Sequence, residues 1–169
     1  YEIGDPNLGM ETSYNLELGW TFKQDWLTTE LSLFNNWFDG YIYNQYTGGL
    51  NEGLPILQIS QSDAVFRGYE AKVSGNLMEN RYGLVDLTLF SDYTRATLTN
   101  GGNGNVPRMP PLRYGAQLDY ARNAWSAFYR VTRGEPQDHP GEGESDTPGW
   151  VQMNVGVQYE AKSYADTRL

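Results

Sequence analysis

The stretch YNLELGWTF at Tyr14–Phe22 alternates strictly between apolar residues and polar or small ones. Tyr14, Leu16, Leu18, Trp20 and Phe22 share one parity, and Asn15, Glu17, Gly19 and Thr21 share the other. Such alternation predicts a β-strand with one apolar face and one polar face. A soluble sandwich buries its apolar faces in a core, whereas an outer-membrane barrel turns them toward lipid and keeps the polar faces inside.

Six further segments show the same alternation, and no segment of comparable length has a helical period. These segments are Leu27–Leu33, with a continuation through Trp37–Tyr43, then Val65–Leu77, Val85–Tyr93, Leu112–Tyr120, Trp125–Val131 and Val151–Tyr159. An eighth strand is expected to start near Thr167–Leu169. The sequence therefore predicts an all-β, antiparallel meander of about seven to eight strands.

Composition limits the class of protein. Apolar residues make up 39% of the 169 residues, and the mean hydropathy is −0.61. No run approaches the roughly 18 apolar residues of a membrane helix, but a β-barrel is not excluded, because half of each strand is polar. The net charge of −9 argues against nucleic acid as a partner, and the absence of cysteine excludes thiolate metal sites and disulfides.

The connections between the predicted strands alternate between short and long. The short ones are Lys23–Trp26, Met78–Gly83, Ala121–Ala124 and Lys162–Asp166. The long ones, rich in glycine, proline and asparagine, are Gln45–Leu57, Thr99–Pro111 and Gly134–Gly149. Outer-membrane barrels sort their connections in this way, with tight periplasmic turns and long external loops.

Aromatic residues gather near both ends of the predicted strands. Trp20, Phe22, Trp26, Tyr82, Tyr120, Trp125 and Tyr159 lie beside the short turns, and Trp37, Tyr41, Tyr43, Tyr93 and Trp150 lie toward the long loops. Two such belts are typical of the two membrane interfaces, although cross-strand pairing in a soluble sheet would also place aromatics together. On the barrel interpretation, the charged parity faces the lumen: Glu17, Glu30, Glu70, Lys72, Asp86, Asp92, Arg113, Asp119, Arg130 and Glu160.

Three segments resemble TonB-dependent outer-membrane receptors. They are GDPNLGMETSYNLELGW (Gly4–Trp20), AVFRGYEAKVSGNL (Ala64–Leu77) and VPRMPPLRYGAQLDY (Val106–Tyr120), and their order and spacing also match. The resemblance implies a 22-stranded barrel that contains an N-terminal plug and imports a scarce nutrient across the outer membrane of a Gram-negative bacterium. Its implied partners are outer-membrane lipid, the TonB complex and a metal ion or metal chelate.

The resemblance covers the barrel and not the plug. Residues 1–169 are therefore expected to be a fragment of the barrel domain of a longer chain, with the plug and the TonB contact outside them. A closed eight-stranded barrel is the competing architecture, and a passive structural barrel or adhesin is the competing function. Thr167–Leu169 is too short for the roughly 9–11 residues of a tilted span, which argues against the closed small barrel.

Two of the stretches are similar to the zinc-uptake subgroup of this family. They are QSDAVFRGYEA (Gln61–Ala71) and the region from Val106 to Tyr159, which includes a Tyr-Arg-Val strand end and a Thr-Pro-Gly connection. This similarity implies zinc as the transported ligand. A ferric siderophore is the alternative, with Arg108 and the Tyr41–Tyr46 section as the residues that would serve it.

The predicted loop Gly134–Asp146 is the stretch with the most suggestive chemistry. It contains the only histidine of the chain, His139, among carboxylates. Imidazole and carboxylate groups are zinc ligands, so Asp138, His139, Glu142 and Glu144 are the candidate metal-binding residues. The alternative is a solvated acidic loop that glycine and proline keep open.

Enzymatic motifs are scarce. The sequence has no GxSxG motif and no phosphate-binding glycine loop that leads into a helix. Asp86 and Glu70 are expected on neighbouring strands, where a ladder of lumen charges explains them better than acid–base chemistry. The sequence therefore predicts no catalytic activity and no resident cofactor.

Overall fold

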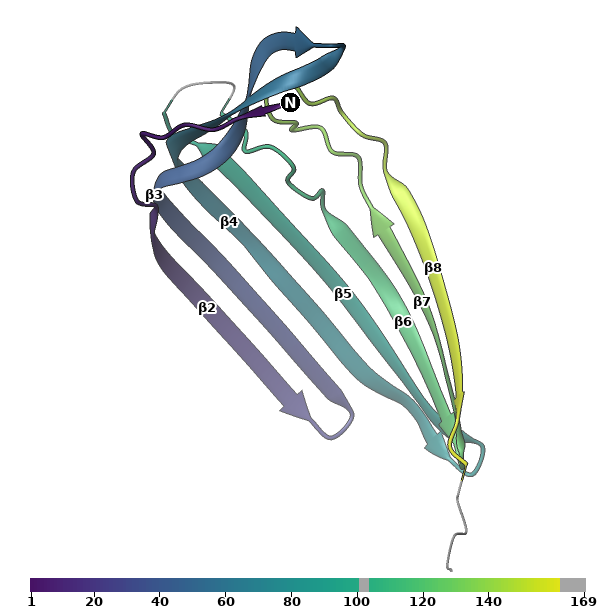
Figure 1. Cartoon of the computed structure of the whole chain (residues 1–169). Helices are drawn as coiled ribbons and strands as arrows, with labels where there is room; N and C mark the ends of the chain where they lie inside the picture. The colour runs from purple at the N-terminus through teal and green to yellow at the C-terminus, as the bar shows by residue number, and fades with distance from the viewer. Residues whose placement is uncertain (101–103, 162–169) are drawn as a thin grey trace, which may run out of the picture.

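The computed structural model describes residues 1–100 and 104–161, and it confirms an all-β chain. Seven strands pair antiparallel in sequence order, as the meander prediction requires. They are β2 (Thr12–Gln24), β3 (Leu27–Asn51), β4 (Leu54–Asn80), β5 (Gly83–Leu98), β6 (Arg113–Arg122), β7 (Trp125–Gly134) and β8 (Trp150–Tyr159) (Figure 1). A short strand that the sequence did not predict, β1 (Glu2–Ile3), pairs parallel with β4.

The seven strands form a single curved layer (Figure 1). Apolar side chains that a sandwich would bury are exposed, for example Leu16 at 63% and Val155 at 76%. In the described part of the chain the buried apolar residues are only Ala64, Ala96, Leu98 and Val106, all near one end of the sheet. The soluble-sandwich interpretation therefore fails. No helix in this part is long and apolar enough to cross a membrane.

The short connections are tight turns at one end of the sheet. Asp25–Trp26, Arg81–Tyr82 and Asn123–Ala124 each join two paired strands, while residues 99–112 and 135–149 connect strands at the opposite end (Figure 1). The alternation of connection lengths is thus confirmed for these connections. The predicted turn Lys162–Asp166 and the strand start at Thr167–Leu169 lie outside the described residues.

The prediction of an open loop at Gln45–Leu57 is wrong. There β3 and β4 continue as a paired hairpin, with Asn51 opposite Leu54. Glu52 and Gly53 form its tip with φ values of 52° and 81°. Two consecutive residues with positive φ make a turn whose twist matches the strands, so pairing continues to the tip. The glycine and asparagine residues here indicate a hairpin end and bulges rather than an open loop.

Strand pairing places the two parities on separate faces across the sheet. On the polar face Glu17, Ser32, Glu70, Asp92 and Arg113 lie near one another on five consecutive strands. Ion pairs join Lys72 to Glu30 at 3.2 Å and Arg113 to Asp92 at 2.7 Å. Asp86 lies opposite Asn76 while Glu70 lies opposite Asp92, so the two carboxylates proposed as a pair do not face each other.

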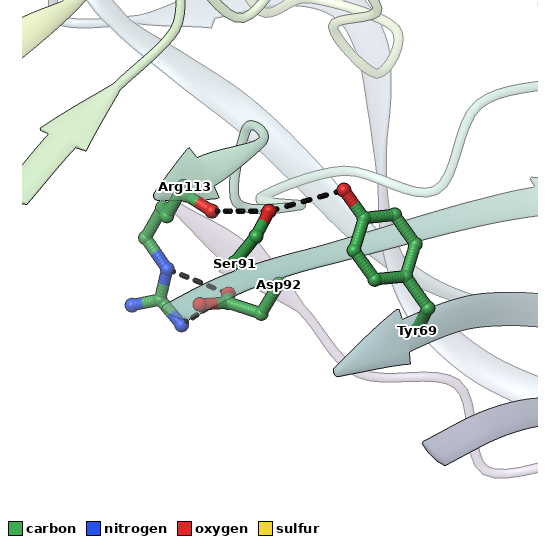
Figure 2. Close-up of polar contacts among 4 residues, drawn as sticks. All are labelled: Tyr69, Ser91, Asp92 and Arg113. Carbon is green, nitrogen blue, oxygen red and sulfur yellow. Dashed lines mark hydrogen bonds and ion pairs between the residues drawn. The ribbon is translucent and has the colours of Figure 1, made fainter. Parts of the chain in front are cut away.

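Arg113, the first residue of β6, is held by β5 through both its side chain and its backbone (Figure 2). Its guanidinium binds Asp92 with two hydrogen bonds of 2.8 and 2.7 Å. The hydroxyl of Ser91 donates to its carbonyl at 3.2 Å and also contacts the hydroxyl of Tyr69 at 3.1 Å. These contacts tie β4, β5 and β6 together where the loop of residues 99–112 ends.

Aromatic rings on the polar face lie over glycines of the neighbouring strand. Phe34 is opposite Gly68, Phe90 is opposite Gly115, and Phe128 is opposite Gly156. A Cβ added to Gly115 would lie 2.6 Å from Cζ of Phe90. The glycines therefore make room for rings that cover the strand backbone, a device that stabilises curved sheets.

The predicted aromatic belts are confirmed only in part. All seven aromatic residues assigned to the short-turn end are exposed, and Trp37 is exposed at the other end. A bulge between Phe38 and Tyr41, with Gly40 at φ 68°, adds one residue to β3 and reverses the alternation beyond it. Tyr41 and Tyr43 consequently lie on the polar side, and Trp150 lies there opposite Gly134.

Candidate binding site at the loop end

The connections at the loop end contact one another and close around the end of the sheet. The amide of Asn105 donates to the carbonyl of Pro140 at 2.9 Å. The backbone N–H of Arg108 donates to both carboxylate oxygens of Glu144, at 3.0 and 3.1 Å. The two long loops are therefore held together as one surface rather than extending independently.

A small apolar core supports this surface on the polar side of the sheet. Phe38 contacts Phe66 and Tyr41 with ring centroids 5.0 and 5.4 Å apart, and Tyr41 stacks on Tyr43 at 6.5 Å. The loop of residues 99–112 inserts Val106, which is 2% exposed, against this group. Because burial of Val106 removes apolar surface from water, it holds the loop against the loop end of the sheet, which we call the mouth.

A hollow of about 410 Å³ lies between the hairpin and this loop. It is lined by Tyr41, Ile42, Tyr43, Asn44, Ile59, Val106, Pro107, Arg108 and Met109. Burial, and then the nearby carboxylate of Glu142, raise the pKa of the Tyr43 hydroxyl. Residues 41–44 of the Tyr41–Tyr46 section thus meet Arg108 in one hollow, and the sequence had suggested both for a chelate.

Gln61 joins three segments at this end of the sheet. Its carboxamide oxygen accepts from the N–H of Gly9 at 2.8 Å, and its nitrogen donates to the carbonyls of Gly40 at 2.6 Å and Gly9 at 3.2 Å. One side chain therefore fixes the N-terminal segment against the bulge that turns Tyr41 inward. Sequence reasoning noted the Gln-Ser-Asp-Ala stretch only as a family resemblance and missed this role.

Replacing Gln61 with alanine is expected to loosen this junction, because it removes three hydrogen bonds at once. The net contribution of each hydrogen bond to stability is about 0.5–1.5 kcal/mol. We expect faster amide exchange at Gly9, whose N–H donates to Gln61, measured by mass spectrometry on the complete protein. Gln58→Ala, on the same strand, is the control, and equal exchange in the two variants would contradict the role given to Gln61.

The structure does not bring the four predicted metal ligands together. Asp138 and His139 pair through Oδ1 and Nδ1 at 2.5 Å and border a hollow beside Tyr69 and Tyr93, on the apolar face. Glu144 instead accepts from two backbone N–H groups, and Glu142 lies near Tyr43 on the other side. Within residues 1–100 and 104–161, no group of three histidine or carboxylate side chains is placed to hold a metal ion. Metal binding by these residues stays a prediction.

Glu135, one residue beyond β7, accepts two strong hydrogen bonds. Arg133 donates through Nε at 2.9 Å, and the hydroxyl of Tyr114 donates at 2.6 Å. The Arg133 bond first, and then the Tyr114 bond, lower the pKa of the Glu135 carboxyl from its ordinary value. The carboxylate thus fixes the start of the loop of residues 135–149 against β6.

The lowered pKa predicts an acid-dependent loss of stability. The contribution of Glu135 is fully present above the ordinary glutamate pKa of 4.5 and is lost as the pH falls through the lower folded value. We expect Glu135→Gln to lower the melting temperature at pH 7, and the difference from the wild type to shrink below pH 4.5. Thermal scans at several pH values test this, and a constant difference would contradict it.

Comparison with known protein families decides the class. The family described as TonB dependent receptor-like, beta-barrel, matches residues 1–169. The chain belongs to this TonB-dependent receptor family. In barrels of this kind that cross a membrane, the apolar face contacts lipid and the polar face lines the interior. The single layer, the sorted connections and the separated faces all agree with that assignment.

Among solved structures, the copper transporter OprC has a similar fold. The TM-score is 0.81 with 18% sequence identity, over 94% of this chain and 26% of that chain. The TonB-dependent receptor segment described here therefore spans about a quarter of that protein's length. The likeness supports the interpretation as a sector of a larger barrel, while the zinc subgroup remains a prediction from sequence.

Proposed function

We propose that this segment belongs to an outer-membrane receptor that captures a metal chelate at its mouth and imports it with energy from the TonB complex. The observation that carries the proposal is the hollow of about 410 Å³, where Tyr41, Tyr43, Arg108 and Met109 converge. Family membership supports import, because TonB-dependent receptors are transporters and not enzymes. A plug and a TonB contact in the complete protein are part of the proposal.

The lining suits an anionic chelate better than a bare cation. Tyrosine rings and a methionine thioether offer flat, polarisable surfaces. The exposed guanidinium of Arg108 supplies a positive charge, while Glu144 fixes the Arg108 backbone and not its side chain. A bidentate guanidinium contact to carboxylate or hydroxamate oxygens would orient such a ligand.

Zinc is the second candidate, and the Asp138–His139 pair favours it. A carboxylate that binds Nδ1 of a histidine directs the Nε2 lone pair outward, as in many zinc sites. The side chain of His139 is 46% exposed. The similarity of Gln61–Ala71 to the zinc-uptake subgroup supports the same cargo, and the fold shared with the copper transporter OprC supports a transition metal in general.

Calorimetry on the complete purified receptor distinguishes the two cargoes. We expect a ferric hydroxamate chelate to bind, and Arg108→Gln to weaken it about tenfold or more, because a charged hydrogen bond is lost. Arg122→Gln, at the short-turn end, is the matched control. Unchanged chelate affinity in Arg108→Gln would remove the hollow as the capture site. Zinc binding that His139→Ala abolishes, without chelate binding, would establish the second candidate.

A further inference from the structure

Two arginines lie directly opposite each other on the apolar face. Arg67 of β4 pairs in register with Arg95 of β5, and the neighbours in the same row are Asn35 and Leu16. Like charges directly opposite each other destabilise a sheet. This pair therefore needs an explanation, since Arg133, which the register also places on this face, is neutralised by Glu135 at 2.9 Å.

Neither guanidinium faces a carboxylate in the described part of the chain. Arg67 is exposed, and no ion pair of its side chain occurs there. Arg95 donates from Nη2 to the side-chain oxygen of Asn105 at 2.8 Å, and its buried Nη1 has no hydrogen-bond partner. Two positive charges without a carboxylate partner are a site that an anion would complete.

The depth of the pair on the sheet indicates where this anion comes from. From Arg67 toward the short turn, the same face of β4 carries Tyr69, Ala71 and Val73. From Arg95, the same face of β5 carries Tyr93, Ser91 and then Leu89. The arginines thus lie just beyond an aromatic level and on the loop side of the apolar band, which is the headgroup level of a bilayer.

A hollow of about 500 Å³ adjoins this level. Tyr69, Tyr93, Pro111, Leu112 and Pro136 supply its apolar and aromatic lining. Its two carboxylates are each paired: Glu135 binds Arg133 at 2.9 Å, and Asp138 binds His139. The arginine pair, which has no ion-pair partner among the described residues, lies beside this hollow.

We propose that Arg67 and Arg95 bind the phosphate of an anionic lipid in the leaflet that surrounds the loop end of the barrel. Guanidinium groups bind phosphate oxygens bidentately, and a shared phosphate turns the repulsion between two arginines into attraction. The aromatic hollow accommodates the remainder of the headgroup. This site faces lipid on the outside of the wall and is separate from the mouth hollow that Arg108 lines.

The test uses the complete receptor in a zwitterionic detergent. Dilauroyl phosphatidic acid and dilauroyl phosphatidylcholine are titrated separately, and binding is followed by native mass spectrometry and thermal unfolding. We expect the phosphatidic acid to bind more tightly and to raise the melting temperature. The preference should fall about fivefold for each arginine replaced by glutamine, in Arg67→Gln, Arg95→Gln and the double variant.

Lys72→Gln removes the same charge from the opposite face of β4 and should leave lipid preference unchanged. Arg67→Lys keeps the charge but loses the bidentate guanidinium contact, so it should retain more binding than Arg67→Gln, which separates the site from a folding defect. Equal lipid preference in wild type and double variant would overturn the proposal. Inorganic phosphate that stabilises the receptor as strongly as phosphatidic acid would also overturn it, since the site would then bind a free anion.

Discussion

Replacing Leu18 with arginine is expected to lower the free energy of unfolding of the complete barrel by about 2–4 kcal/mol. Leu18 lies at the middle of β2 on the apolar face, opposite Leu33, and is 67% exposed. In a membrane this exposure is contact with lipid, where an arginine loses its hydration near the midplane. Urea unfolding in phosphatidylcholine vesicles, followed by tryptophan fluorescence, measures the effect.

The neighbouring residue supplies the control for this experiment. Gly19 points to the polar face, and a Cβ added there meets nothing within 4 Å. Gly19→Arg therefore places the same side chain one position away on the side that lines the interior, where we expect a change within about 0.5 kcal/mol. A loss of equal size in both variants would mean that the two faces are not distinguished by lipid.

The second large effect is expected at Gly115, where alanine should destabilise the barrel by about 1–3 kcal/mol. A Cβ at this position would meet the backbone carbonyl oxygen of Val131, as well as Cζ of Phe90 at 2.6 Å. A side chain can rotate away, but the paired backbone cannot move without disturbing the ladder between β6 and β7. Melting temperature and urea unfolding of the complete receptor both report the change.

Gly19→Ala should behave in the opposite way. Its Cβ has open space, and alanine lowers the conformational entropy that a strand glycine loses on folding, so stability should rise by about 0.5–1 kcal/mol. Phe90→Leu in the Gly115→Ala background tests the two contacts separately. Recovery there would assign the effect to the ring, and no recovery would assign it to the carbonyl of Val131.

Family membership and these two experiments concern the wall of the barrel, whereas the proposed capture site lies at the loop end. The wall is stabilised mainly by one effect, the separation of apolar and polar side chains across a single layer. The mouth is fixed by single contacts, such as the Gln61 hydrogen bonds and the insertion of Val106. Substitutions at the mouth are therefore expected to change ligand binding more than the stability of the sheet.

The sequence alone determined the wall. Alternation in Tyr14–Phe22 and its repeats assigned each side chain to a face, because successive residues of a strand point to opposite sides. The tight turns Asp25–Trp26 and Asn123–Ala124 also followed from the short length and the composition of the connections between the predicted strands. These features are local, so neither distant contacts nor the remainder of a barrel were needed to predict them.

Only the tertiary structure decided the mouth. One extra residue at the Gly40 bulge sends Tyr41 and Tyr43 to the polar side, and an alternation pattern cannot show such a shift without the partner strand. The same holds for the loop of residues 135–149, whose Asp138 and Glu142 lie on opposite sides of the wall. A loop has no period, so contacts with other segments determine where its side chains point.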